Sequence, residues 1–376
     1  MKYKETLLFI AKSLTITLEE KNRAEIKSIL KSSDVDWDVF VKLSTSHNVF
    51  TTIYLNFKRA NFLKYLPDDL VDYMKYITNL NKSRNLQILK QVKELNNLLL
   101  ANNITPIFLK GVSNLWAGIY QNISERMIGD IDFIFSNEDY PKAITVLRDF
   151  GYFDVEKRKY YDPETRHHRR LQKKNHIAAI EIHKELIIED YTSEFNYNLI
   201  KKDIQIIKGV CILSYANKLN LSIISFQIND NGFYYKTMSL RNAYDVFLLS
   251  KKTNAKVAVT LYDKLTNPLN CFLAACYEVF NKIDSLEYNN NKKAESYLRA
   301  LNKNYTNRNI AKIQYKIIKT YLSFKSKLII LQKSLIYKEY RLWLFNILTD
   351  ITWYGEKLRK LGIFVKIRKN KSSKSN

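Results

Sequence analysis

Apolar residues in the first 100 positions recur at the three- and four-residue spacing of amphipathic helices. The clearest series consists of Leu86, Leu89, Val92, Leu95, Leu98 and Leu99. Because side chains at this spacing lie on one face of a helix, we expect them to form one buried stripe. The sequence therefore predicts an N-terminal helical region over residues 1–100.

The pattern changes at residues 102–106, where polar residues and a proline end the helical spacing. Polar and apolar residues alternate over residues 130–135, which is typical of a strand. Ser136 and Asp139 have the spacing of a helix cap, and Gly151 favours the end of that helix. In chain order we expect a strand at 107–109, a helix at 112–120, a strand at 130–135, a helix ending near 149 and a strand at 177–186.

After residue 190 the pattern returns to helical spacing, with no internal repeat and no long linker. The sequence thus predicts an α+β fold in three regions: N-terminal helices at 1–100, a small mixed β-sheet core at 101–190 and a C-terminal helical domain at 191–376. We expect the chain to end in a solvated basic tail. The tail includes Lys366, Arg368, Lys369, Lys371 and Lys374.

Composition narrows the class of protein. Of the 376 residues, 46% are hydrophobic and 13% aromatic, values of a globular protein rather than of a disordered or fibrous one. Three cysteines without a C-x-x-C pair argue against a disulfide framework and against a structural zinc site. No stretch approaches the roughly 20 uncharged residues that span a bilayer. Because a signal-peptide pattern is also missing, we expect a cytoplasmic protein without a transmembrane segment.

The formal net charge of +24 is large. A positive field attracts nucleotides, nucleic acids and anionic lipid surfaces, and the charge alone does not select among them. An AT-rich source genome is an alternative explanation, because the chain is rich in Asn and Ile as well as in Lys.

Asp130 and Asp132 lie two positions apart in the expected strand at 130–135. Alternate side chains share a strand face, so the two carboxylates point the same way, about 7 Å apart, while Ile131 and Phe133 point into the core. Neighbouring carboxylates repel one another unless a cation lies between them, and Mg²⁺ prefers carboxylate and phosphate oxygens. A solvated strand face is the alternative explanation, because an Asp-x-Asp sequence alone is common.

The expected strand at 177–186 supplies a third carboxylate, Glu181, on the same face as His183. If this strand lies beside the one with the aspartates, about 4.8 Å away, the three acids can hold two Mg²⁺ ions, with Mn²⁺ as an alternative. One ion would lower the pKa of an attacking hydroxyl, and the other would stabilise a departing pyrophosphate. We expect Asp130 and Asp132 to bridge the ions and Glu181 to lie nearest the attacking group, as a general base.

A phosphate-binding turn is expected at Lys110 and Gly111, between a strand and a helix, where glycine lets the backbone approach closely. Ser113 adds a hydroxyl group. Arg126, four residues before Asp130, has the planar donor fork that binds a triphosphate. An ion pair between Arg126 and a neighbouring acid is the alternative.

Histidines and basic residues gather between residues 157 and 183. The histidines are His167, His168, His176 and His183. Their spacing matches no closed zinc site, so we expect neutral or phosphate-facing roles, with His183 and His168 supporting the carboxylates. The basic run, which either receives an anionic acceptor or is solvated, consists of Lys157, Arg158, Lys159, Arg166, Arg169, Arg170, Lys173 and Lys174.

Several of these motifs occur together in one known order. They are Ile-Phe-Leu-Lys-Gly at 107–111, Arg126 with Asp-Ile-Asp at 130–132, Gly151-Tyr152, His167-His168 and Ile-Glu-Ile-His at 180–183. In order and spacing this series resembles the uncharacterised bacterial nucleotidyltransferases of the DNA polymerase β-like superfamily. Leu240-Arg241 and Tyr244-Asp245 more loosely resemble the helix that follows the catalytic region in that family. One departure is Val112 after Gly111, where many members have Gly-Gly or Gly-Ser.

The resemblance implies an NTP donor, two Mg²⁺ ions and transfer of a nucleoside monophosphate to a hydroxyl or phosphate group of an acceptor. It does not identify the acceptor, for which a small molecule or cell-envelope precursor is favoured over a protein side chain or an RNA end. Two alternatives stay open. One is a metal-dependent glycosyltransferase that uses a nucleotide-sugar, and the other is a non-catalytic basic helical protein that binds RNA, a partner protein or an anionic surface.

Overall fold

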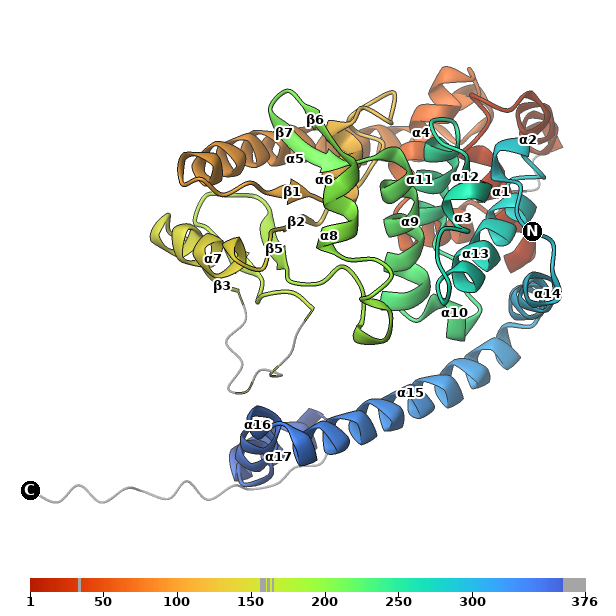
Figure 1. The fold of residues 1–376 in the computed structure, drawn as a ribbon. Coiled ribbons are helices and arrows are strands. Elements are labelled where there is room, and N and C mark those ends of the chain that lie inside the picture. The colour runs from red at the N-terminus through yellow and green to blue at the C-terminus, as the bar shows by residue number, and fades with distance from the viewer. Residues whose placement is uncertain (33–34, 156–159, 161–162, 164–165, 361–376) are drawn as a thin grey trace, which may run out of the picture. The chain divides into compact units, whose positions relative to one another are not determined.

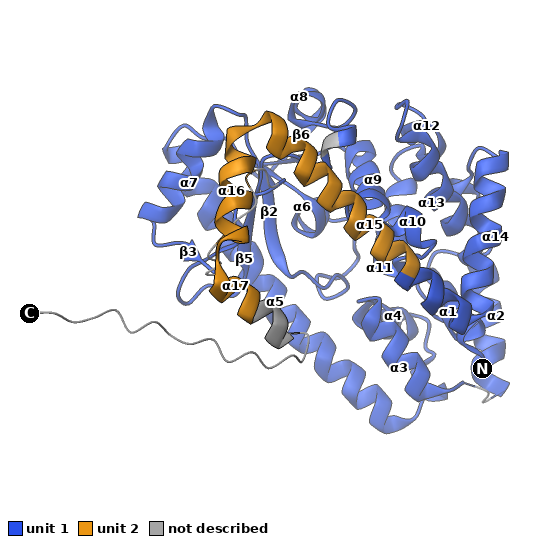
Figure 2. Cartoon of the chain, turned by 90° about the horizontal axis from the view of Figure 1, so that it is seen from below, with its two compact units in different colours: residues 1–156, 166–316 blue, residues 157–165, 317–376 orange. Residues whose placement is uncertain are grey.

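The computed structural model describes residues 1–32, 35–155, 160, 163 and 166–360. The chain divides into two compact units (Figures 1 and 2). Unit 1 comprises Met1–Glu156 and Arg166–Lys316, and unit 2 comprises Lys157–Thr165 and Ile317–Asn376. The predicted basic tail and the start of the predicted basic run, residues 157–159, lie outside the described residues. Unit 1 contains the sheet and all the predicted site residues.

Unit 1 begins with helices, as predicted. They are α1 (Tyr3–Ser13), α2 (Glu20–Ser32), α3 (Trp37–Ser46), α4 (Phe50–Arg59), the single turn η1 (Leu63–Tyr65) and α5 (Asp68–Ala101). The predicted stripe on α5 is only partly right, because Val92 and Leu95 are buried whereas Leu86 is 53% exposed. The buried face also includes Asn85 and Gln91. These polar residues hydrogen-bond to neighbouring loops, a role that apolar spacing does not reveal.

A seven-stranded mixed sheet follows, in the order β3-β4-β5-β2-β1-β7-β6. The strands are β1 (Ile107–Phe108), β2 (Asp130–Ile134), β3 (Phe153–Asp154), β4 (Leu171–Gln172), β5 (Ala179–His183), β6 (Ile204–Ile207) and β7 (Val210–Leu213). The pairs β2–β5 and β1–β7 are parallel, and the other neighbours are antiparallel. This arrangement confirms the predicted α+β class.

Two helices connect the strands of the predicted core. Helix α6 (Lys110–Trp116) follows β1, and α7 (Asp139–Asp149) follows β2. The backbone N–H of Asp139 donates to Ser136 Oγ at 3.1 Å, and Gly151 adopts a left-handed φ of +94° just after α7. Both boundaries of α7 therefore agree with the sequence prediction.

The sheet extends further than the sequence predicts. Only helices were expected after residue 190, but β6 and β7 form a hairpin there, and β7 pairs with β1. Lys208 and Gly209 turn the hairpin with φ values of +50° and +75°, the left-handed pair that suits a two-residue turn. All four residues of β7 are buried. A short run that is apolar on both faces shows no period of two, so its pattern does not distinguish a strand from a helix.

Helices complete unit 1. They are α8 (Tyr197–Ile200), α9 (Tyr215–Ile224), α10 (Gly232–Tyr235), α11 (Leu240–Ser250), α12 (Ala255–Ala258), α13 (Thr266–Val279) and α14 (Lys292–Thr306), with short turns η2 (Glu189–Tyr191), η3 (Lys201–Asp203), η4 (Ser225–Asn229) and η5 (Asp284–Leu286) between them. One hydrophobic core joins these helices, the sheet and the N-terminal helices, through residues such as Phe9, Phe133 and Phe272. The sheet is therefore held on a single packed scaffold.

Polar side chains on α5 fix the loops that enter β2 and β5. Asn85 Nδ2 donates to the carbonyl oxygens of Ile123 and Arg126, both at 2.7 Å. Gln91 exchanges two hydrogen bonds with the backbone of Ala178, at 2.9 and 3.2 Å. Because buried backbone groups need partners, these bonds set where each loop runs. Helix α5 therefore holds the loops that lead into both β2 and β5.

Between residues 317 and 360 unit 2 is mainly helical. Helix α15 (Arg308–Ile336) begins in unit 1 and continues into unit 2, where α16 (Lys338–Leu348) and α17 (Ile351–Lys360) follow (Figure 2). Tyr340 and Ile347 on α16 are buried. Across the described part of the chain, no helix combines the length and the apolar character needed to cross a bilayer.

Candidate metal and nucleotide site

The register of β2 and β5 brings the predicted carboxylates together. The two strands are adjacent and parallel, with Asp132 opposite Glu181 and Asp130 opposite Ala179. On the other face, Ile131 and Phe133 are fully buried. The acids therefore share the face that points away from this core, as the alternation of residues predicts.

Two cations hold the three acids in the structure. Lys110 Nζ lies 2.5 Å from Asp132 Oδ1 and 3.8 Å from Glu181 Oε2. The guanidinium of Arg170 forms an ion pair with Asp130 and donates from Nε to Glu181 Oε1 at 3.2 Å. Since Glu181 shares one cation with each aspartate, the three carboxylates converge on one place. This is the convergence on which the sequence-based hypothesis depends.

The two facing acids differ in their readiness to take up a proton. Burial alone would raise the pKa of Asp132, but Lys110 and the hydrogen bond from His183 outweigh it and lower that pKa well below its usual range. Burial and then the charge of Asp132 raise the pKa of Glu181 to about 7. Around neutral pH, Asp132 is therefore ionised while Glu181 is poised to exchange a proton.

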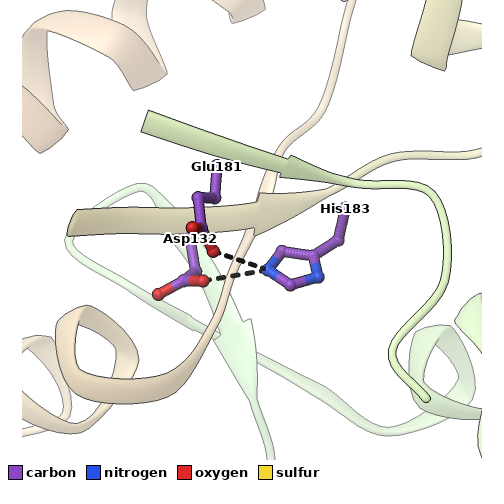
Figure 3. Close-up of side chains that lie close together, drawn as sticks. All are labelled: Asp132, Glu181 and His183. Atoms are coloured by element: carbon purple, nitrogen blue, oxygen red, sulfur yellow. Dashed lines mark hydrogen bonds and ion pairs between the residues drawn. The ribbon is translucent and has the colours of Figure 1, made fainter. Parts of the chain in front are cut away.

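His183 supports Asp132 from the same strand as Glu181 (Figure 3). Its Nε2 lies 2.9 Å from Asp132 Oδ1, and its ring is buried. Burial lowers the pKa of His183 to about 4, so the ring is neutral at pH 7 and carries one proton. The hydrogen bond to an ionised carboxylate places that proton on Nε2.

The donor set suits a divalent cation. Asp132, Glu181 and His183 each offer a ligand atom, and these atoms lie within 4.8 Å of one another (Figure 3). Carboxylate oxygens are the ligands that Mg²⁺ and Mn²⁺ prefer. Because His183 Nε2 carries the proton of its bond to Asp132, this histidine would orient the carboxylate and would not bind the cation itself. Asp130 adds a further carboxylate, because it shares the guanidinium of Arg170 with Glu181. The residues therefore fit a metal site.

The predicted phosphate turn has an unusual backbone at Lys110. This lysine adopts a left-handed φ of +50°, which is uncommon for a residue with a side chain and is typical of functional sites. A Cβ on Gly111 would lie 3.3 Å from the side chain of Ile128, so a larger residue here would have to displace that side chain slightly. Ser113 is fully buried, and its Oγ has no hydrogen-bond partner among the described residues. The turn thus presents the Lys110 side chain and not the Ser113 hydroxyl.

Arg126 lies behind the turn in a buried ion pair. Its guanidinium is 3.0 Å from Asp245 Oδ2 on α11, and Tyr120 donates to the other oxygen of Asp245 at 2.5 Å. The ion pair that the sequence left as an alternative is therefore present. A Cβ added to Gly111 would lie 3.9 Å from Arg126 Cζ, so the ion pair of Arg126 and Asp245 adjoins the turn.

Arg241 is a second cation near Arg126. In the sequence only its resemblance to a helix segment of the family distinguishes it. The charge of Arg126, and then burial, lower the pKa of Arg241. Its Nε is buried and has no hydrogen-bond partner among the described residues. Partial burial raises the pKa of Asp230, and Arg166, Lys110 and Arg241 oppose that rise. All three cations therefore act electrostatically on one carboxylate, that of Asp230.

The basic run is divided between the site and its surroundings. Arg170 binds the carboxylates. Burial lowers the pKa of Arg166, and the nearby charges of Glu181 and Asp132 act in the opposite direction. The ring of His167 packs against His183, with centroids 5.7 Å apart. His168 instead adjoins Arg148 and Asp154, and its Nε2 has no partner among the described residues. Arg166, His167 and Arg170 therefore lie on the side of the carboxylates, whereas His168 and Arg169 lie on the side of Asp154.

The fold and the site define a class of protein. A mixed sheet presents acids from two adjacent strands, next to a lysine-bearing turn and a group of arginines, as expected for an enzyme that binds a polyphosphate with a divalent cation. A family model described as uncharacterised nucleotidyltransferase matches residues 33–280, about two thirds of the chain. The chain therefore belongs to this family. Searches of curated proteins and of solved structures gave no significant match.

Proposed function

We propose that the protein is a nucleotidyltransferase that uses a divalent cation to move a nucleoside monophosphate from an NTP to a hydroxyl group of an acceptor. Family membership supports nucleotidyl transfer. The observation that carries the metal-dependent mechanism is the register that places Glu181 opposite Asp132 on the neighbouring strand. No comparable observation favours a glycosyltransferase or a non-catalytic protein.

Asp130, Asp132 and Glu181 would hold the cation, with Mg²⁺ preferred and Mn²⁺ as an alternative. When bound, the cation would neutralise phosphate charge and lower the pKa of the acceptor hydroxyl. His183 would keep Asp132 oriented by donating from Nε2, a bond present in the structure at 2.9 Å.

In the proposed reaction the hydroxyl oxygen of the acceptor attacks the α-phosphorus of the NTP. A new P–O bond forms, the bond between the α-phosphorus and the bridging oxygen breaks, and pyrophosphate leaves. Glu181 takes the hydroxyl proton. In the metal-free site its pKa is raised to about 7 whereas that of Asp132 is lowered, so Glu181 is the stronger proton acceptor of these two acids.

Four cations would bind the phosphate groups. In the structure Lys110 and Arg170 form ion pairs with the carboxylates. We propose that a bound divalent cation replaces them there and that both side chains then bind the triphosphate. Arg166 and Arg241 add positive charge on the side of Asp230. Arg241 is the clearest candidate of these two, because its buried Nε lacks a partner among the described residues.

The acceptor is a separate proposal. A small molecule or cell-envelope precursor is preferred over a protein side chain or an RNA end.

The proposal is tested by incubating the purified chain with each α-labelled NTP, Mg²⁺ and a cell extract, and by following label transfer and pyrophosphate release. The wild type should transfer label from at least one NTP, and EDTA should stop the transfer. Asp132→Asn should abolish it without unfolding the chain. Asp154→Asn is the matched control, because this aspartate lies on the same sheet but pairs with exposed Arg148.

Three outcomes would count against the proposal. These are equal loss of activity in Asp132→Asn and Asp154→Asn, label transfer that persists in EDTA, and absence of NTP binding. Release of nucleotide from a UDP-sugar, without pyrophosphate formation from any NTP, would instead support a glycosyltransferase.

A further inference from the structure

Helix α15 carries an uncovered apolar stripe within unit 2. Its members recur at alternating spacings of four and three residues: Ile317, Tyr321, Phe324, Leu328, Leu331 and Leu335. Their exposed fractions run from 43% for Leu328 to 80% for Leu335. At 1.5 Å per residue the stripe is about 27 Å long. Six large apolar side chains in one exposed row are more than a solvated helix face needs.

The two helices after α15 also expose large apolar residues. Leu342, Phe345 and Leu348 on α16 are 53%, 64% and 57% exposed, and Ile351 on α17 is 72% exposed. The indole Nε1 of Trp343, a group that favours the border between apolar and polar surroundings, is buried without a hydrogen-bond partner among the described residues.

Positive charge borders the stripe. Helix α15 contains no acidic residue at all. At about 100° per residue, Lys325 and Lys327 lie about 80° to either side of the centre of the stripe, a position from which their long side chains can reach past it. Lys319 and Lys333 lie on the opposite side of the helix. An apolar row flanked by lysines is the pattern of a helix that lies in the plane of an anionic membrane surface.

A second copy of the chain fits this stripe less well. The four-three spacing would suit a coiled coil, in which flanking residues of opposite charge usually pair. Here the charged residues beside the stripe, Lys325 and Lys327, have one sign, so two such helices would repel one another. A nucleic acid would match the charge, but it would leave the apolar row in water. A surface with negative headgroups above an apolar layer matches both features.

We propose that α15–α17 form a membrane-binding surface that inserts this apolar stripe between the headgroups of an anionic lipid bilayer. The helices lie along the interface and do not cross the bilayer. The flanking lysines contact lipid phosphates while the stripe enters the apolar boundary layer. The proposal is independent of the reaction proposed for unit 1.

The test is flotation of the full chain with vesicles of phosphatidylcholine alone and with vesicles that also contain phosphatidylglycerol. The chain should float with the anionic vesicles, less so as salt is raised, and not with neutral ones. Phe324→Ser should lower the partition coefficient about tenfold, since the ring would lose its burial in the lipid. Ile206→Ser is the matched control, because Ile206 on β6 is 68% exposed, close to the 61% of Phe324, and it should bind as the wild type does.

A charge variant distinguishes binding to anionic lipid from nonspecific hydrophobic adsorption. Lys325→Glu with Lys327→Glu should lower binding to anionic vesicles by at least about tenfold, because each lysine near such a surface contributes about fivefold. The circular dichroism spectrum should be unchanged, since these side chains lie at the surface of α15.

Several results would overturn the proposal. One is failure to float with anionic vesicles, and another is equal binding by Phe324→Ser and wild type. Concentration-dependent dimers that Phe324→Ser abolishes, without vesicle binding, would assign the stripe to a second copy. Tight binding of a labelled RNA, weakened by the lysine variant without vesicle binding, would assign the surface to nucleic acid.

Discussion

Replacing Glu181 by Gln should remove a specific pH dependence of stability. In the metal-free protein the pKa of Glu181 is about 7, raised from 4.5 by burial and by the charge of Asp132. A raised pKa means that the fold disfavours the ionised form. Below a pH of about 4.5 Glu181 is protonated in both the folded and the unfolded state and does not affect the free energy of unfolding. As the pH rises to about 7, ionisation in the unfolded state lowers the free energy of unfolding, and above about 7 this loss stays constant. Gln keeps the size and the acceptor oxygen but cannot ionise.

The magnitude follows from the shift. Each pKa unit corresponds to about 1.4 kcal/mol, so the shift of Glu181 corresponds to about 3 kcal/mol. In urea unfolding with EDTA, the two proteins should have similar stability at pH 4.5, and Glu181→Gln should be more stable by about 3 kcal/mol at pH 8. Titrating groups that do not contact Glu181 contribute equally to both proteins and cancel in the difference.

Mg²⁺ should reverse the order of stability of the wild type and Glu181→Gln. At pH 8 the cation should stabilise the wild type, because it binds the folded carboxylates, and it should stabilise Glu181→Gln less. A stability difference that does not change between pH 4.5 and pH 8 would refute the electrostatic argument. An equal effect of Mg²⁺ on both proteins would refute the role of Glu181 as a ligand.

Three further predictions concern the scaffold and the phosphate groups. Asn85→Ala should lower the free energy of unfolding by about 1–3 kcal/mol in urea, because the carbonyl of Ile123 loses its donor and that of Arg126 keeps only the longer bond from Asn81, whereas Leu86→Ala at the next, exposed position should change it by less than about 0.5 kcal/mol; similar values for the two would contradict the anchoring role. Asp245→Asn should cost about 3 kcal/mol by leaving Arg126 buried beside a neutral partner, and an unchanged melting temperature would show that the pair is not needed. Arg241→Met should raise the KM for the NTP about tenfold without loss of stability, because one charge-assisted phosphate contact is removed, and an unchanged KM would exclude that contact.

Much of the site was predictable because its signals are local. Alternation along six residues places Asp130 and Asp132 on one face, and the same rule applies to Glu181 and His183. Whether the two strands are neighbours is a condition that the sequence leaves open, and the parallel pairing of β2 and β5 meets it. The end of α7 was equally local, because a left-handed glycine stops a helix within a few residues.

The partners of these residues were less predictable, because tertiary packing selects them from distant parts of the chain. Arg126 and Asp245 are 119 positions apart, and nothing in either segment indicates the other. Arg170 is one of eight basic residues in that run, and no local feature of the sequence shows that it binds Asp130 and Glu181. The β6–β7 hairpin was missed for a different reason, since a fully buried strand loses the alternation that identifies a half-buried one.

The central claim, that the carboxylates of β2 and β5 form a catalytic metal site, is tested most directly by anomalous diffraction from crystals grown with Mn²⁺ and a non-hydrolysable NTP analogue. The account predicts Mn²⁺ peaks about 2.1–2.2 Å from the carboxylate oxygens of Asp130, Asp132 and Glu181, with the triphosphate beside Lys110. Bound nucleotide without Mn²⁺ at these acids, or Mn²⁺ only elsewhere in the crystal, would contradict it.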